Sequence, residues 1–151
     1  MPNTATNNLL LLAGRVLLSA MFIMSGYSKL VDPAGTAGMI AGAGFPAATA
    51  LAYLAGAFEL VAGLAVIAGF QTRIAAILLA VFTVFTGLVF HSGPINVPDF
   101  PEAANGLLTV FNGLMMMKNI TIAGGFLALA AVGAGAYSLD ARRRGSVAIA
   151  A

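Results

Sequence analysis

Long apolar runs, each interrupted by very few charges, dominate the chain. A helix needs about 20 mostly apolar residues to cross the hydrocarbon core of a bilayer. Four stretches meet this requirement, at about residues 8–29, 47–70, 73–91 and 119–139. The pattern therefore predicts an all-α membrane protein built as a bundle of four transmembrane helices. Because these spans use more than half of the chain, we expect residues 1–151 to form a single membrane domain.

Polar and helix-breaking residues mark the connections between these spans. The first connection lies between Asp32-Pro33 and Gly44-Phe45-Pro46, and its small, weakly apolar interior predicts a segment on the membrane surface. A short turn before Arg73 joins the second and third spans, so these two must be antiparallel neighbours. The third connection, residues 92–105, is the most polar region of the chain.

Residues 99–118 predict an amphipathic helix ahead of the fourth span. Asn105, Thr109 and Asn112 fall on one helical stripe, and apolar residues occupy the opposite face. This segment is too polar to cross the membrane by itself. We therefore expect an amphipathic interfacial helix that leads into the fourth span.

Positively charged residues predict the orientation of the bundle. Arg142, Arg143 and Arg144 follow the fourth span, and Arg73 lies in the turn between the second and third spans. With four spans, these groups come to the same side of the membrane. The positive-inside rule assigns that side to the cytoplasm, so we expect both termini there.

Composition narrows the classes of function. Hydrophobic residues make up 60% of the chain and charged residues only 8%, against about 25% charged residues in soluble domains. Lipid is therefore the expected surrounding. The basic residues are scattered at helix ends, which argues against a nucleic-acid partner despite the net charge of +2. With no cysteine and a single histidine, the chain is not expected to ligate a metal, an iron–sulfur cluster or a haem.

Two charged residues lie deep inside predicted spans. A charge at the centre of a transmembrane helix costs about 2.5–3.5 kcal/mol on insertion scales, so such residues usually have a role. Counted at about 1.5 Å per residue, Arg15 lies roughly 10 Å and Glu59 roughly 15 Å from the cytoplasmic helix ends. We therefore expect an Arg15–Glu59 ion pair. It could be a structural clasp, or part of a quinone head-group or proton-relay site.

Four further polar residues are expected together at the outer ends of the spans. They are Lys29, His91, Lys118 and Asn119. A lysine at this level usually anchors a helix by extending its ammonium group to the interface. The alternative is that these residues form the polar end of a pocket for a lipophilic ligand. His91 is the one side chain here that titrates near neutral pH, so it could accept a proton in such a pocket.

Several motifs in the chain resemble the DoxX family of membrane proteins. They are R-x(6)-F-x(3)-G-x(2)-K from Arg15 to Lys29, FELVAGLAVIAGFQTR, KNITIAGG and GAGAYSLD. The resemblance implies a four-helix protein of a bacterial or archaeal inner membrane. The family takes its name from a small subunit of a quinol oxidase linked to thiosulfate:quinone oxidoreduction, and other members associate with thiol-redox or detoxification partners. Its charged motif residues match Arg15, Lys29, Glu59, Lys118 and Asn119.

The first functional hypothesis is a membrane subunit of a quinone- or quinol-linked oxidoreductase. Glu59 and His91 would exchange protons, and a ligand-binding set would hold the quinone, consisting of Arg15, Lys29, Lys118 and Asn119. A redox partner protein would supply or accept the electrons. The alternative is a non-enzymatic scaffold that anchors a partner complex. A small-molecule transporter is a third hypothesis, which would require a homo-oligomer because the four spans contain no broken helices.

Overall fold

The computed structural model describes residues 4–143, and the regular structure in that part of the chain is helical. The helices are α1 (Thr4–Val31), α2 (Ala34–Gly42), α3 (Ala48–Ala68), α4 (Thr72–His91) and α5 (Glu102–Val132). By length and composition, α1, α3, α4 and α5 could each cross a membrane. The predicted all-α architecture with four spans is therefore confirmed. Arg144, one of the residues used to predict the orientation, lies outside the described residues.

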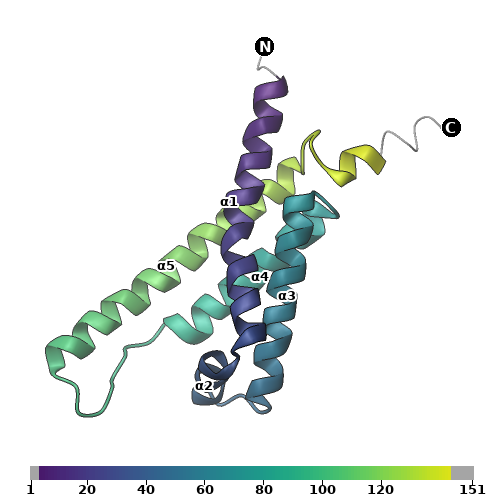
Figure 1. The fold of residues 1–151 in the computed structure, drawn as a ribbon. Helices are drawn as coiled ribbons and strands as arrows, with labels where there is room; N and C mark the ends of the chain where they lie inside the picture. Colours follow the sequence, from purple (N-terminus) through teal and green to yellow (C-terminus); the bar gives the residue numbers. More distant parts are fainter. Residues whose placement is uncertain (1–3, 144–151) are drawn as a thin grey trace.

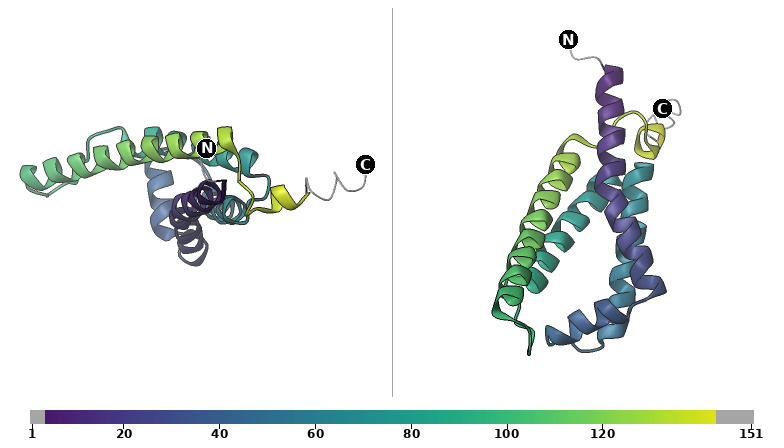
Figure 2. Two further views of the ribbon diagram at one scale, coloured as in Figure 1. Left: turned by 90° about the horizontal axis from the view of Figure 1, so that it is seen from above. Right: turned by 60° about the vertical axis from the view of Figure 1, so that its left-hand side comes forward.

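The long helices form two pairs that meet at one end and separate at the other. α1 packs along α3, and α4 packs along α5. The pairs converge at the end where α1 begins and α5 finishes, and they diverge at the end that holds α2 (Figures 1 and 2). The first and last described segments thus lie at the convergent end, as expected for an even number of spans.

The tight crossing of α1 and α3 depends on two glycines. A Cβ atom on Gly26 would lie 2.6 Å from the carbonyl oxygen of Gly56 and 2.6 Å from the backbone nitrogen of Leu60. A Cβ atom on Gly56 would lie 2.9 Å from Cβ of Lys29. Helices in lipid associate largely through close packing at small residues. This crossing brings the end of α1 against the middle of α3.

The packed core lies where the two pairs converge. Phe22 of α1 and Phe126 of α5 meet edge to face with their ring centroids 5.4 Å apart, and Val66 and Leu79 are completely buried beside them. Many large apolar side chains on the outer faces remain exposed. That distribution is expected where lipid rather than water covers the surface.

The amphipathic helix and the fourth span form one continuous helix, α5. At about 1.5 Å per residue its 31 residues extend for about 46 Å. It ends at Val132, before the predicted end at residue 139, because Gly133 leaves the helix with φ of 86°. Residues 139–143 then form a separate short helical turn.

The polar stripe on the first half of α5 has a role that the sequence pattern did not predict. Asn105 and Thr109 accept hydrogen bonds from the backbone N–H groups of Val97 and Ile95, at 2.9 and 3.0 Å. Asn112 donates to the carbonyl oxygen of Gly93 at 2.9 Å. The stripe therefore satisfies the backbone of the connection that runs beside it, because that segment has no regular hydrogen bonding of its own.

Candidate ligand cavity

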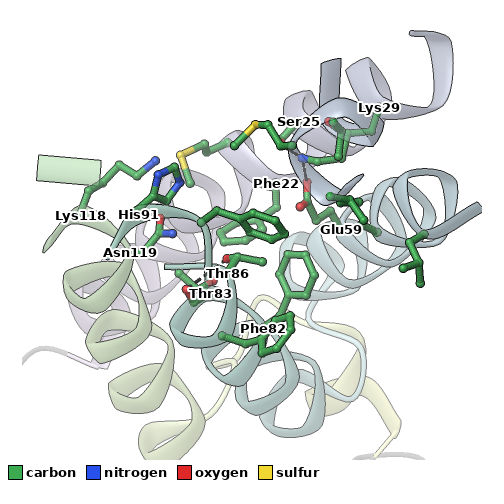
Figure 3. A pocket seen from close by; sticks show the side chains of 18 of the residues that line it. Phe22, Ser25, Lys29, Glu59, Phe82, Thr83, Thr86, His91, Lys118 and Asn119 are labelled. Carbon is green, nitrogen blue, oxygen red and sulfur yellow. Dashed lines mark hydrogen bonds and ion pairs between the residues drawn. The ribbon is translucent and has the colours of Figure 1, made fainter. Parts of the chain in front are cut away.

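A cavity of about 480 Å³ opens between the two helix pairs at their divergent end. We call it the inter-pair cavity, and Figure 3 shows it from close by. Side chains of α1, α2, α3, α4 and α5 all contribute to it, together with Phe45 of the connection after α2. The lining residues are Met21, Phe22, Ser25, Lys29, Thr36, Met39, Ile40, Phe45, Leu51, Ala55, Glu59, Phe82, Thr83, Phe85, Thr86, Phe90, His91, Lys118 and Asn119.

Aromatic and methionine side chains form most of the apolar wall. Phe82, Phe85 and Phe90 come from one helix, α4, and Phe22 is contributed by α1. Phe82 is held in place by Phe58, with ring centroids 5.0 Å apart. Flat aromatic faces stack on rings at little entropic cost. The wall is therefore suited to a planar, lipophilic group.

One side of the cavity carries an ion pair. Lys29 Nζ lies 2.9 Å from Glu59 Oε2 and also donates a hydrogen bond to Ser25 Oγ. The Glu59 side chain is only 6% exposed, and that of Lys29 is 19% exposed. The close crossing of α1 and α3 makes this contact possible. It holds Lys29 of α1 against Gly56 of α3, and Glu59 lies about one helical turn beyond Gly56. The two charges compensate each other inside an otherwise apolar wall.

The opposite side of the cavity carries His91, Lys118 and Asn119 (Figure 3). His91 Nδ1 lies 2.8 Å from Asn112 Oδ1. Since the Asn112 amide nitrogen donates to Gly93, its oxygen must be the acceptor, and His91 Nδ1 carries the proton. In the neutral imidazole, Nε2 is then an unprotonated hydrogen-bond acceptor.

The structure therefore brings five of the six sequence-predicted site residues to one cavity, on two opposing sides. They are Lys29, Glu59, His91, Lys118 and Asn119. Their predicted roles in binding and proton exchange remain predictions. What the structure adds is their arrangement, with an ion pair on one side and a histidine, an ammonium group and an amide on the other.

The sixth residue, Arg15, lies elsewhere, and the predicted Arg15–Glu59 pair is wrong. Arg15 is 1% exposed, and its guanidinium donates to the backbone carbonyls of Val66, Ala134 and Tyr137, each at 2.8 Å, and to that of Ile67. These carbonyls lie near the end of α3 and in the segment after α5, where helical partners run out. Arginine satisfies them because its planar group presents five donors. Arg15 is a structural clasp at the convergent end.

Asp140 completes this clasp and was missed by the sequence reasoning. Its carboxylate accepts hydrogen bonds from the backbone N–H groups of Gln71 and Thr72, at 2.8 and 2.9 Å, and from the Thr72 hydroxyl at 2.9 Å. It therefore caps the start of α4, where the helix dipole favours a negative charge. No local pattern reveals a cap that comes from the other end of the chain.

The cavity also contains residues that the sequence reasoning passed over. Thr83 and Thr86 lie three residues apart on one face of α4, and Phe90 follows four residues later on the same face, which is a signal that could have identified the two threonines as part of a cavity wall. The α2 side chains Thr36, Met39 and Ile40 could not be assigned to the cavity wall. Nothing in their sequence shows that α2 packs at the divergent end of the helix pairs, where the cavity lies.

The part of the chain between residues 4 and 143 contains no group of three or more histidine, aspartate or glutamate residues placed to hold a metal ion. The chain has no cysteine.

Comparisons with known proteins agree with this architecture. The model of the DoxX family matches residues 10–92. Inner membrane protein YqjF of Escherichia coli strain K12 is 40% identical over 129 residues, covering 85% of this chain and 88% of the relative. Inner membrane protein YphA of the same organism is 34% identical over 138 residues, covering 91% and 93%. No solved structure matches the chain. On this evidence of sequence and architecture, the chain belongs to the DoxX family.

Proposed function

We propose that this protein is a subunit of a quinone- or quinol-linked oxidoreductase system. It would bind a quinone-like lipophilic ligand in the inter-pair cavity and work with a redox partner protein. The observation that carries the proposal is the cavity itself, in which aromatic walls separate two opposing polar sides. A planar ring with oxygen atoms on opposite edges is complementary to this arrangement.

The size and chemistry of the cavity fit such a ligand. Small-molecule sites usually enclose about 300–1,000 Å³ and combine apolar walls with a few polar groups, and this cavity of about 480 Å³ does so. A bound quinone would supply reversible two-electron, two-proton chemistry. Lys29 and Glu59 would hold one ring oxygen, with Glu59 exchanging protons, and His91 Nε2 would accept a proton on the other side.

The electrons would have to come from, or go to, another protein. The chain has no cysteine and one histidine, so its own side chains provide no obvious resident redox centre. A surface for a partner is offered by the first half of α5, where Leu107, Val110 and Phe111 are more than half exposed. The first half of α5 extends away from the α1–α3 pair (Figure 1).

The relatives and the charges support a location in the cell. Both E. coli relatives are inner membrane proteins by name, and we assign this chain to the bacterial inner membrane as a multi-pass protein. Arg73, Arg142 and Arg143 belong to segments at the convergent end, and by the positive-inside rule this supports an orientation with that end and both termini in the cytoplasm. The cavity would then open in the outer half of the membrane.

A non-enzymatic scaffold is the second candidate function. The observation in its favour is the same exposed first half of α5, which could anchor a partner without any ligand in the cavity. A partner that remains bound when the cavity is blocked, together with an absence of quinone binding, would favour the scaffold.

A matched pair of alanine substitutions on α3 tests the proposal. Ala55 lines the cavity, whereas Ala57 is exposed and does not. We expect Ala55→Phe to fill the cavity and weaken binding of 1,4-naphthoquinone to the detergent-purified protein at least about tenfold, since the same volume cannot hold two rings. Ala57→Phe should bind as the wild type does. Equal binding by the two variants would refute the cavity as the site.

A further inference from the structure

We infer that the His91 side of the inter-pair cavity binds an oxyanion through Lys118 and Asn119, so that the preferred ligand is an acidic, negatively charged lipophile. The inference deepens the proposed function and rests on it, because it assigns the charge class of the ligand in the same cavity. The charged side chains that line the cavity carry the inference. The lining residues include two ammonium groups, on Lys29 and Lys118, and one carboxylate, on Glu59.

The single carboxylate is already used by one of the two lysines. Glu59 Oε2 accepts from Lys29 at 2.9 Å, on the far side of the cavity from Lys118. Within residues 4–143, no acidic side chain or other acceptor is bonded to Lys118. His91 cannot supply the missing negative charge, because an imidazole is neutral or positive. The wall therefore carries one uncompensated cation when His91 is neutral.

The position of Lys118 argues against a simple interfacial anchor. It lies near the middle of α5, about 21 Å from the end at Val132 by helix rise, a distance shorter than the roughly 30 Å thickness of a hydrocarbon core. Its side chain extends toward His91 at the cavity rather than along the outer face (Figure 3). An ammonium group in such surroundings is stabilised by an anionic partner.

Asn119 provides the second, independent observation. Its side chain lines the cavity, yet the residue is only 7% exposed and its amide is bonded to no other group in the described part of the chain. It is held closely by α4, because a Cβ atom on Gly87 would lie 3.1 Å from Asn119 Cβ. An amide that faces a largely apolar cavity without a hydrogen-bond partner is unfavourable. An oxyanion between Lys118 and Asn119 would satisfy both donors with charge-assisted hydrogen bonds.

Two sources could provide this chemistry: an ionised acidic quinone, or the phosphate of an anionic lipid whose chains enter between the helix pairs. Their common feature is an oxyanion attached to an apolar group. The experiment therefore needs one comparison that tests for the oxyanion and a second that separates the sources.

The first comparison uses 2-hydroxy-1,4-naphthoquinone, an anion at neutral pH, and 2-methoxy-1,4-naphthoquinone, its neutral analogue. We expect the wild-type protein in non-ionic detergent to bind the anion about tenfold more tightly, as is typical of a hydrogen bond to a charged group. Lys118→Met should abolish this preference, and Lys118→Arg should retain it. Arg73→Gln removes a positive charge near the convergent end and should leave the preference unchanged.

The second comparison places the protein in nanodiscs of phosphatidylcholine with or without phosphatidylglycerol. If the lipid phosphate is the natural oxyanion, phosphatidylglycerol will compete with the hydroxyquinone in the wild type but not in Lys118→Met. If it does not compete, a free acidic ligand is the source.

The outcomes separate this inference from the proposed function. If wild-type protein binds the methoxy compound as well as the hydroxy compound, the oxyanion site is overturned and the quinone cavity stands. If the preference survives in Lys118→Met, Lys118 is not the recognising group and the inference also fails. If neither naphthoquinone binds, the proposed function fails with it. The wild-type preference alone decides the matter should a Lys118 variant not fold.

Discussion

The crossing of α1 and α3 at Gly26 predicts a measurable link between helix packing and the cavity. In Gly26→Ala, the new Cβ atom would lie 2.6 Å from two backbone atoms of α3. Ordinary contacts begin at 3.4 Å, so the helices must move apart by about 0.8 Å. Neither obstacle is the end of a flexible side chain, because both belong to the α3 backbone. The strain therefore cannot be relieved by a change of rotamer.

Overpacking of this kind costs about 1–3 kcal/mol, and we expect Gly26→Ala to lower the free energy of unfolding by that amount. The same separation would stretch the Lys29–Glu59 contact from 2.9 Å to about 3.7 Å if nothing else moved, which is beyond hydrogen-bonding distance. Quinone binding should weaken along with stability, because the ion pair forms one side of the cavity.

Gly14→Ala is the matched control, because it lies in the same helix and a Cβ atom there would meet nothing within 4 Å. Alanine favours helix by about 1 kcal/mol over glycine, so this variant should be as stable as the wild type or slightly more stable. Denaturant unfolding in detergent, followed by circular dichroism, gives the comparison. If Gly26→Ala proves as stable as Gly14→Ala, the close crossing does not exist as described.

The clasp at the convergent end gives two further predictions. Arg15→Met should destabilise the protein by more than about 3 kcal/mol, because it removes the donors of four backbone carbonyls at once. A hydrogen bond to a charged group contributes about 1.5–3 kcal/mol. A variant that resists thermal unfolding as well as the wild type does would contradict this. Gly69→Ala should lower the melting temperature more than Gly44→Ala does. Both glycines have positive φ, but only at Gly69 would a Cβ atom meet neighbours, 2.9 Å from Ser138 Cα and 2.9 Å from the Arg15 guanidinium; equal effects would show that φ strain alone matters.

The sequence predicted the first three spans closely, because a membrane-crossing helix is specified by its own length and apolarity. It predicted that a fourth such helix exists but not its bounds, since α5 begins at Glu102 and ends at Val132. It also placed Lys29, His91, Lys118 and Asn119 at one level, since depth along a helix follows from counting residues. The cavity lies at the same level, and all four residues line it. Most of the polar residues that line the cavity could therefore be predicted from the sequence alone.

The partner of Glu59 could not be obtained by counting. Depth is one coordinate, whereas pairing also depends on helix rotation and on where two helices cross. The crossing at Gly26 and Gly56 brings Lys29, rather than Arg15, to Glu59. Asp140 was missed for a related reason, because its partners at Gln71 and Thr72 are distant in the chain and are brought near only by the folded segment after α5.

The central claim is that a lipophilic ring occupies the inter-pair cavity, and photoaffinity labelling with an azido-naphthoquinone tests it most directly. The account predicts that mass spectrometry will locate the label on cavity residues of α4 and α5, such as Phe85, Phe90 and Lys118, and that excess unmodified naphthoquinone will suppress it. Label confined to outward-facing α3 residues such as Leu54 and Val61, and not suppressed by excess quinone, would contradict the account.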